Sequence, residues 1–164
     1  MTPDTLLNLA IIPAMGELAK YNIFDTLQAR QMLLTIALQE SGLLHRRQVT
    51  ASGLEDGPAV SWWQFEKGGS VHGMLTHPVS APIMKAICVA HGIAPTEQGL
   101  WDAMRYNDIV AACAARLNLY VLPDRLAVTA DQGWAQYVSA WRPGKPKPDT
   151  WPTNWAKAKP FIYA

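Results

Sequence analysis

The sequence predicts a mainly α-helical protein, and three observations lead to this fold class. The length of 164 residues suits one domain with an adequate core, and no segment resembles an interdomain linker, so residues 1–164 are expected to form a single domain. Apolar residues recur at helical spacing, and glycines break that spacing mainly between residues 45 and 77. We therefore expect about six to eight helices around a central buried helix, with a glycine-rich region of loop and short strands.

The first helix is predicted to begin after Thr2, because Pro3 and Asp4 are typical of a first helical turn. Pro13 is expected to kink or restart this helix, which then runs towards Lys20.

The central helix is predicted to begin at Asp25, an N-cap residue with Gln28 three positions later, and to end near Gly42. One face of this helix is apolar and carries Ala29, Leu33, Ile36 and Ala37.

Four further helices are expected after the glycine-rich region, each behind a polar residue that suits an N-cap. These residues are Ser80, Thr96, Asn107 and Asp131. Beyond Trp141, prolines exclude regular structure until a short helix that follows Pro152.

Composition narrows the classes of function that this protein is expected to have. A formal net charge of +1 predicts no nucleic-acid surface, and no apolar run is long enough for a membrane span. Cys88 and Cys113 are expected in the core, and His72 and His77 lack partners at ligand spacing, so neither a metal nor another cofactor is predicted. The N-terminus has no signal-peptide pattern, which predicts synthesis in the cytoplasm.

Glu40 is the unusual residue of the central helix, since it continues the apolar face where a leucine would be expected. A buried carboxylate is costly unless it is paired, neutralised by a raised pKa, or placed in a cleft that uses that pKa. An ion pair with Arg105 or Arg116 and a catalytic acid are equally compatible with the spacing.

Two motifs resemble the lysozyme-like superfamily, in particular lytic transglycosylases and goose-type lysozymes. Glu40-Ser41-Gly42 ends the central helix as their Glu-Ser-Gly does, and the segment Ser61-Trp62-Trp63-Gln64 stands for their later "GLMQ"-like segment. The stretches "WWQFEKGGSVHGMLTHP" and "WRPGKP" resemble lysozyme-like proteins of tailed phages and prophages more closely. The resemblance spans residues 33–144, with Ser61 in place of the usual glycine.

This resemblance implies cleavage of the β-1,4 bond between N-acetylmuramic acid and N-acetylglucosamine in peptidoglycan, with Glu40 as the proton donor. Ser41 would orient the acid or the substrate, while Ser61, Gln64 and either Trp62 or Trp63 would contact the glycan. The third family signature, an aromatic residue near a helix end, corresponds to Tyr137 or Trp141; Tyr137 is the better polar candidate.

A second carboxylate would distinguish hydrolysis from transglycosylation, because an inverting hydrolase needs a base that activates water. Glu66 lies two residues after Gln64, as the acid of goose-type lysozymes does. Glu55 and Asp56, on the glycine-rich connection before the motif, are further candidates, although charges there, Glu55 above all, are also typical of solvated loops. In a transglycosylase the muramic acid's own hydroxyl attacks instead and leaves a 1,6-anhydro product. The stronger match of Glu-Ser-Gly favours transglycosylation.

The expected partners are peptidoglycan glycan strands and, for a phage protein, other virion proteins that would deliver it to the wall. The groove is expected between Val49 and Met74, and the basic run at residues 45–47 is interpreted as solvated surface that can also meet peptide-stem carboxylates. The rival hypothesis is a virion structural or docking protein that keeps the fold without activity.

Overall fold

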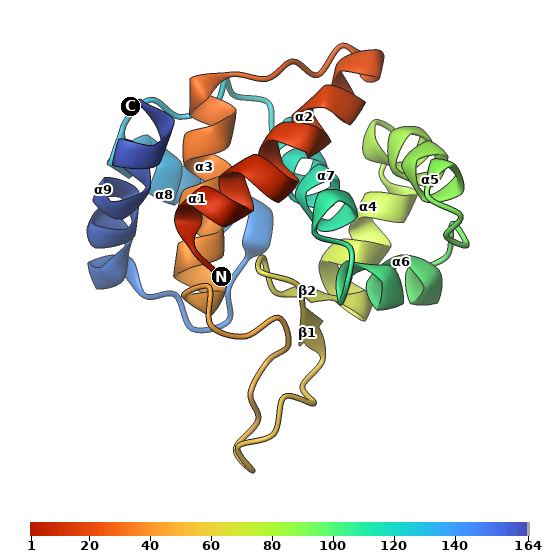
Figure 1. The fold of residues 1–164 in the computed structure, drawn as a ribbon, viewed down its shortest axis with the longest axis horizontal. Coiled ribbons are helices and arrows are strands. Elements are labelled where there is room, and N and C mark those ends of the chain that lie inside the picture. The colour runs from red at the N-terminus through yellow and green to blue at the C-terminus, as the bar shows by residue number, and fades with distance from the viewer. Residues whose placement is uncertain (164) are drawn as a thin grey trace.

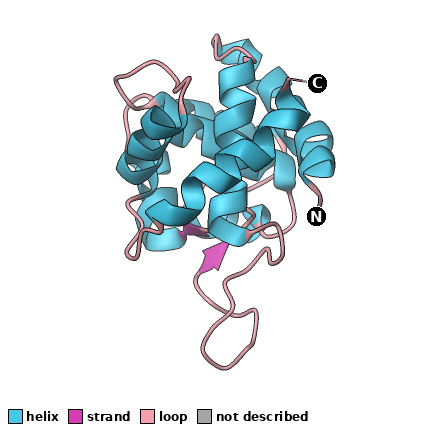
Figure 2. Ribbon diagram, turned by 90° about the vertical axis from the view of Figure 1, so that its left-hand side faces the viewer, coloured by secondary structure: helices cyan, strands magenta, loops and turns pink. Residues whose placement is uncertain are grey.

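The computed structural model describes residues 1–163 and is mainly α-helical (Figures 1 and 2). The helices are α1 (Pro3–Leu6), α2 (Ile12–Leu18), α3 (Leu27–Ser41), α4 (His72–Thr76), α5 (Ser80–Ala90), α6 (Glu97–Met104), α7 (Asp108–Tyr120), α8 (Ala130–Trp141) and α9 (Trp151–Ile162). Strands β1 (Ala59–Val60) and β2 (Phe65–Glu66) pair antiparallel. The predicted class, mainly α with short strands, is confirmed.

The N-terminal helix does not break at Pro13. Instead, α1 and α2 join through a π-helical turn, Leu7–Ile11, and form one rod. The wider turn lies where the proline ring would otherwise press on the preceding turn of an α-helix, so the chain continues without a restart. With the rod counted once, the described residues form eight helices, within the predicted range.

The central helix α3 begins one residue later than predicted. Its N-cap is Thr26, whose hydroxyl oxygen accepts a hydrogen bond from the Ala29 backbone N–H at 3.1 Å. Asp25 instead accepts hydrogen bonds from the Arg30 guanidinium. Gly42 ends the helix as expected, with a left-handed φ of 58°.

The later helix starts were predicted with mixed success. Thr96 and Asn107 are the N-caps of α6 and α7. The other two caps were wrong: Thr129 caps α8, and Ser80 is already helical, with its hydroxyl donating to the Met74 carbonyl at 2.9 Å. Both errors shift a boundary by one or two residues: Thr129 lies two positions before Asp131, and Val79, which makes no side-chain cap, lies one position before Ser80.

The glycine-rich region contains more helix than its composition predicts. A π-helical turn, Lys67–Val71, leads into α4 despite three glycines in these ten residues. Val71, Met74 and Leu75 are buried there, and tertiary burial of that apolar face outweighs the low helix propensity of glycine.

The core is built on α3 and α7, each of which has nine buried residues. Helix α9 lies along α3 (Figure 1), where the buried Gln31 amide donates to the Trp155 carbonyl at 2.9 Å. The predicted short helix after Pro152 is therefore a full packing partner of the central helix. Cys88 and Cys113 are buried and free, as the apolar pattern indicated.

Gly133 on α8 tests this packing. A Cβ there would lie 2.6 Å from the Trp155 ring and 3.1 Å from the Met32 sulfur, so Gly133→Ala must displace α9 from α3 and α8. We expect a loss of about 1–3 kcal/mol in the free energy of unfolding, measured by urea denaturation.

The matched control is Gly16→Ala on α2, where an added Cβ meets no atom within 4 Å. It should stabilise the protein by about 0.5–1 kcal/mol through helix propensity alone. Equal effects of the two substitutions would contradict the packing of α8 against α9.

Candidate active site

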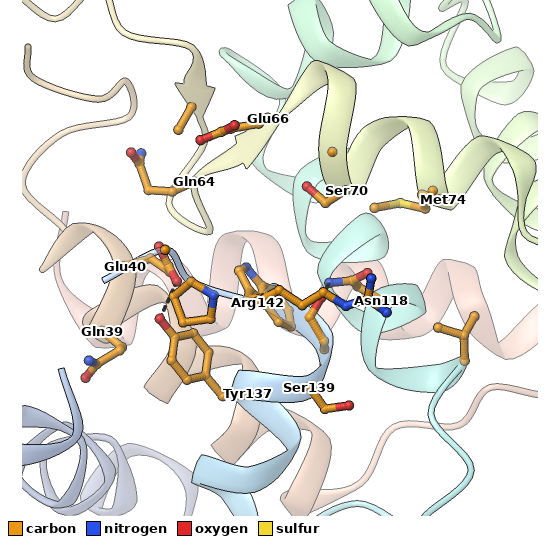
Figure 3. Close-up of a pocket in the computed structure, with 18 of the residues that line it drawn as sticks. Gln39, Glu40, Gln64, Glu66, Ser70, Met74, Asn118, Tyr137, Ser139 and Arg142 are labelled. Carbon is orange, nitrogen blue, oxygen red and sulfur yellow. Dashed lines mark hydrogen bonds between the residues drawn. The ribbon is translucent and has the colours of Figure 1, made fainter. Parts of the chain in front are cut away.

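One cleft of about 930 Å³ is lined by side chains that could act as acids, bases or ligand-binding groups (Figure 3). Its walls come from the C-terminal end of α3, the β1–β2 pair, α4 and the turn before it, and the ends of α7 and α8. The polar and charged side chains along it are Gln39, Glu40, Gln48, Gln64, Glu66, Ser70, His77, Ser80, Asn118, Tyr137, Ser139, Arg142, Lys145 and Lys147.

Glu40 lies where the last turn of α3 opens into this cleft. Burial raises the pKa of its carboxyl group to about 6, because a charged carboxylate is poorly solvated beside the apolar core. The hydrogen bond from Tyr137 and the charge of Lys147 partly oppose that rise, whereas the negative charge of Glu66 adds to it. Glu40 is therefore half protonated at about pH 6, and roughly a tenth of it is protonated at pH 7.

Tyr137 fixes the orientation of this carboxyl group. Its hydroxyl donates to Glu40 Oε1 at 2.6 Å, as the dashed line in Figure 3 shows. The ring is 3 % exposed and stacks on Trp151 of α9, and its surroundings raise the phenol pKa, so the hydroxyl stays protonated. With Oε1 accepting, the acidic proton of neutral Glu40 belongs on Oε2.

Neither arginine considered as an ion-pair partner reaches Glu40. Arg105 pairs with Asp102, and Arg116 stacks over the Tyr120 ring at 5.5 Å. No described cation forms an ion pair with Glu40. Of the alternatives for Glu40, the structure therefore supports a carboxyl group with a raised pKa at a cleft, and not a buried ion pair.

Gln64 and Glu66 line the same cleft, on the wall that Figure 3 shows across from Tyr137. Two residues of the turn that leads to Glu66 have a left-handed backbone conformation: Ser61, with φ 69°, and Gln64 itself, with φ 51°. Ser61 is fully buried. Its hydroxyl accepts a hydrogen bond from the backbone N–H of Trp63, and its carbonyl accepts one from the side-chain amide of Gln64 at 2.8 Å. Ser61 therefore shapes the turn and does not line the cleft.

The two tryptophans expected to hold a glycan are both buried. Trp63 has no exposed surface, and its indole N–H donates to the Leu33 carbonyl at 2.9 Å. Trp62 is 5 % exposed and lies under the Arg46 guanidinium at 5.0 Å. Neither ring lines the cleft, so the expected stacking on sugars has no surface to use; the rings anchor the second motif to the core instead.

Ser41 and Trp141 join the motifs to one another. The Ser41 hydroxyl lies 2.9 Å from the carbonyls of both Ala37 and Trp62, which ties the end of α3 to the second motif. Trp141 donates its indole N–H to the Trp63 carbonyl at 2.9 Å, and it also lines the cleft. Of the two, only Trp141 presents a side chain to a ligand in the cleft.

Asp56 belongs to the connection between α3 and β1, which extends as a loop below the rest of the molecule in Figure 1. It is exposed and accepts a hydrogen bond from the Thr50 hydroxyl at 2.8 Å, and it does not line the cleft.

The basic run at residues 45–47 is also engaged elsewhere: His45 pairs with Glu55 and Arg46 with Asp108, while Arg47 donates to the Gly57 carbonyl. Of the expected groove region, residues 49–74, only the part from Ala59 to Met74 contributes to the cleft, and residues 49–58 do not line it.

Sequence reasoning missed the cations Arg142, Lys145 and Lys147 and the polar pair Asn118 and Ser139. The signal for the cations was present, since they alternate with prolines in "RPGKPK" after the aromatic signature. Nothing in the pattern of α7 and α8 singled out the other two.

The described residues contain no cluster of His, Cys, Asp and Glu side chains suited to a metal, and none of their helices has the length and apolar content to cross a bilayer. Comparison with protein families, curated proteins and solved structures finds no match to this chain.

The raised pKa of Glu40 predicts a pH-dependent stability difference between the protein and Glu40→Gln. Because the pKa is about 6 when folded and 4.5 ordinarily, the carboxyl group contributes stability below pH 4.5 that is lost as pH rises through about 6. The variant's advantage in free energy of unfolding should therefore be about 2 kcal/mol larger at pH 8 than at pH 4.

Urea denaturation at pH 4, 6 and 8 measures this difference. Asp124→Asn, at an exposed loop carboxylate outside the cleft, controls for removal of one charge. Parallel pH curves for the parent and Glu40→Gln would show that burial does not perturb Glu40.

Proposed function

We propose that this protein cleaves the β-1,4 bond between N-acetylmuramic acid and N-acetylglucosamine in peptidoglycan, with Glu40 as a single general acid and base. The observation that carries the proposal is a half-buried carboxyl group with a pKa of about 6, oriented by Tyr137 at the wall of a long polar cleft. Glycosidic cleavage requires an acid that is still protonated near neutral pH.

In the first step, neutral Glu40 donates its proton to the glycosidic oxygen as the bond to the anomeric carbon breaks. The resulting carboxylate then accepts a proton from the attacking hydroxyl, which restores the acid. Tyr137 donates to Glu40 Oε1 throughout, and its high pKa keeps it from exchanging its own proton. Lys147 favours the carboxylate form that exists between the two steps.

The backbone at Ser61 supports the match to the lysozyme-like second motif. The resembled families carry glycine at this position, and here it has a left-handed φ of 69°, a conformation that favours glycine. The same register places Gln64 in the cleft with Glu40. A lysozyme-like architecture is thus a proposal that agrees with both the motif spacing and this backbone conformation.

Glu66 is the better candidate for a second acid, because it lines the cleft and its charge acts on Glu40, whereas Asp56 does neither. Both product chemistries use the same first step. Transglycosylation remains our preferred reaction, on the strength of the Glu-Ser-Gly motif. A protein of this function would be carried to the wall as a virion component or released by a partner.

Glu40→Gln should abolish lysis, with activity at least about 10²-fold below the parent, while the fold is retained or stabilised. Zymography on cell walls and mass spectrometry of the released muropeptides measure this. Glu55→Gln, which removes an exposed loop carboxylate outside the cleft, is the matched control and should lyse walls as the parent does.

Lysis by Glu40→Gln within a few-fold of the parent would exclude Glu40 as the acid. A folded parent protein that clears no wall would favour the rival function, an inactive virion structural or docking protein. That rival draws support from the burial of Trp62 and Trp63, which leaves the cleft without these two sugar platforms.

Glu66→Gln distinguishes the two reactions. If Glu66 activates water, the substitution should lower the rate by about 10²-fold or more with little change in substrate binding, because that contact is made mainly in the transition state. A transglycosylase should tolerate the substitution and release anhydro-muropeptides. Asp56→Asn is the control and should keep parental activity in both cases. Our preference for transglycosylation would be reversed if the parent released only products with reducing ends and if Glu66→Gln no longer released them.

A further inference from the structure

The segment Arg142–Lys147, which we call the cationic strap, forms one side of the cleft. Its three cations, Arg142, Lys145 and Lys147, are exposed and line the cleft, and none forms an ion pair with a described carboxylate. Most other basic side chains near the second motif are already engaged, as Arg46 is with Asp108. The strap is therefore the part of the cleft with positive charge free for a ligand.

The strap is held in place at both ends. Arg142 has a left-handed φ of 48°, and its backbone N–H donates to the Val138 carbonyl at the end of α8. At the other end, the Lys147 carbonyl accepts from the Gln39 amide at 3.1 Å and from the Thr150 hydroxyl at 3.0 Å. Prolines at positions 143 and 146 restrict the backbone between these anchors, so little order has to be gained when a ligand binds.

Charge is distributed unevenly along the cleft. The carboxylates Glu40 and Glu66 lie at one end, where the charge of Lys147 also acts on Glu40, and Figure 3 shows Arg142, Asn118 and Ser139 together towards the other. Asn118 is fixed there by a hydrogen bond from its amide to the Ala140 carbonyl at 3.1 Å. A guanidinium beside hydroxyl and amide groups suits a carboxylate attached to a peptide, because arginine can bind both carboxylate oxygens at once.

We propose that the cationic strap binds the carboxylates of the peptide stems that peptidoglycan carries on its muramic acid residues, and so selects stem-bearing glycan over uncharged chains. This inference rests on the proposed function and names the part of the substrate that the cleft recognises. A neutral chitin chain has no carboxylate that could pair with the cations of the strap. The sources of a carboxylate in peptidoglycan are the stem and, once the stem is removed, the lactyl group.

The test measures binding in the Glu40→Gln background, so that no ligand is consumed. The strap variant is Arg142→Gln with Lys145→Gln; Lys147 is left intact because its charge also acts on Glu40. The matched control is Lys157→Gln with Lys159→Gln, two exposed lysines of α9 outside the cleft that remove the same charge. The ligands are stem-bearing glycan oligomers, the same oligomers after amidase treatment, and chitooligosaccharides.

We expect the strap variant to bind stem-bearing oligomers about tenfold more weakly than the control does, with a smaller dependence on salt. Binding of chitooligosaccharides should be equal in the two proteins. If the loss appears only after amidase treatment, the lactyl group that the amidase frees is the carboxylate bound, and the assignment to the stem is overturned.

Equal binding of stem-bearing oligomers by the strap variant and the control would overturn the proposal while leaving the proposed function intact, provided that the parent still cleaves walls. A parent that neither binds nor cleaves any of these glycans would instead contradict the proposed function itself. Circular dichroism on both variants shows that they are folded, since all four substituted side chains are exposed.

Discussion

The burial of one carboxyl group at the end of α3 is the constraint on which the arrangement of this cleft depends. Glu40 occupies a position that an apolar side chain would fill at lower cost, and no described cation pairs with it. The phenol of Tyr137 supplies one hydrogen bond, and the cleft supplies access to solvent. Holding that phenol in place is the task of α8 and α9, through the stack of Tyr137 on Trp151.

The aromatic residues of this chain serve mainly to hold segments together. Trp63 donates to the carbonyl of Leu33 on α3, and Trp141 donates to the carbonyl of Trp63, so α3, the second motif and the end of α8 form one hydrogen-bonded series. Tryptophan suits this use because it combines a large apolar surface with one donor. The consequence for ligands is a cleft whose recognition groups are amides, hydroxyls and charges, with Trp141 as the tryptophan that lines it.

A buried acid and left-handed backbone at two non-glycine residues both cost stability. Ser61 and Gln64 adopt this backbone conformation three residues apart in the turn that carries the second motif, and that turn places Gln64 in the cleft with Glu40. Proteins commonly accept such local costs where a site needs a specific geometry and offset them through the rest of the core. Here the two buried helices α3 and α7 provide that core.

The sequence alone predicted the fold class, the burial of one face of α3, its end at Gly42 and two of the later caps. These features depend on local periodicity and on which residue types satisfy helix ends. It also singled out Glu40, because a carboxylate on an apolar face is visible as a local exception, whereas Tyr137 was named together with Trp141 only through the resemblance to the third family signature.

Only the tertiary structure decided which partners these residues meet. Whether Glu40 faces Arg105, Arg116 or Tyr137 depends on how distant helices pack, and that packing is not encoded in the spacing within any one of them. The same holds for Trp62 and Trp63, which suited a sugar platform by composition and are buried because the turn at Ser61 directs the chain into the core. Long-range packing also gathered the unpaired cations of residues 142–147 along the cleft, since charge in a proline-rich segment says nothing about the surface it will face.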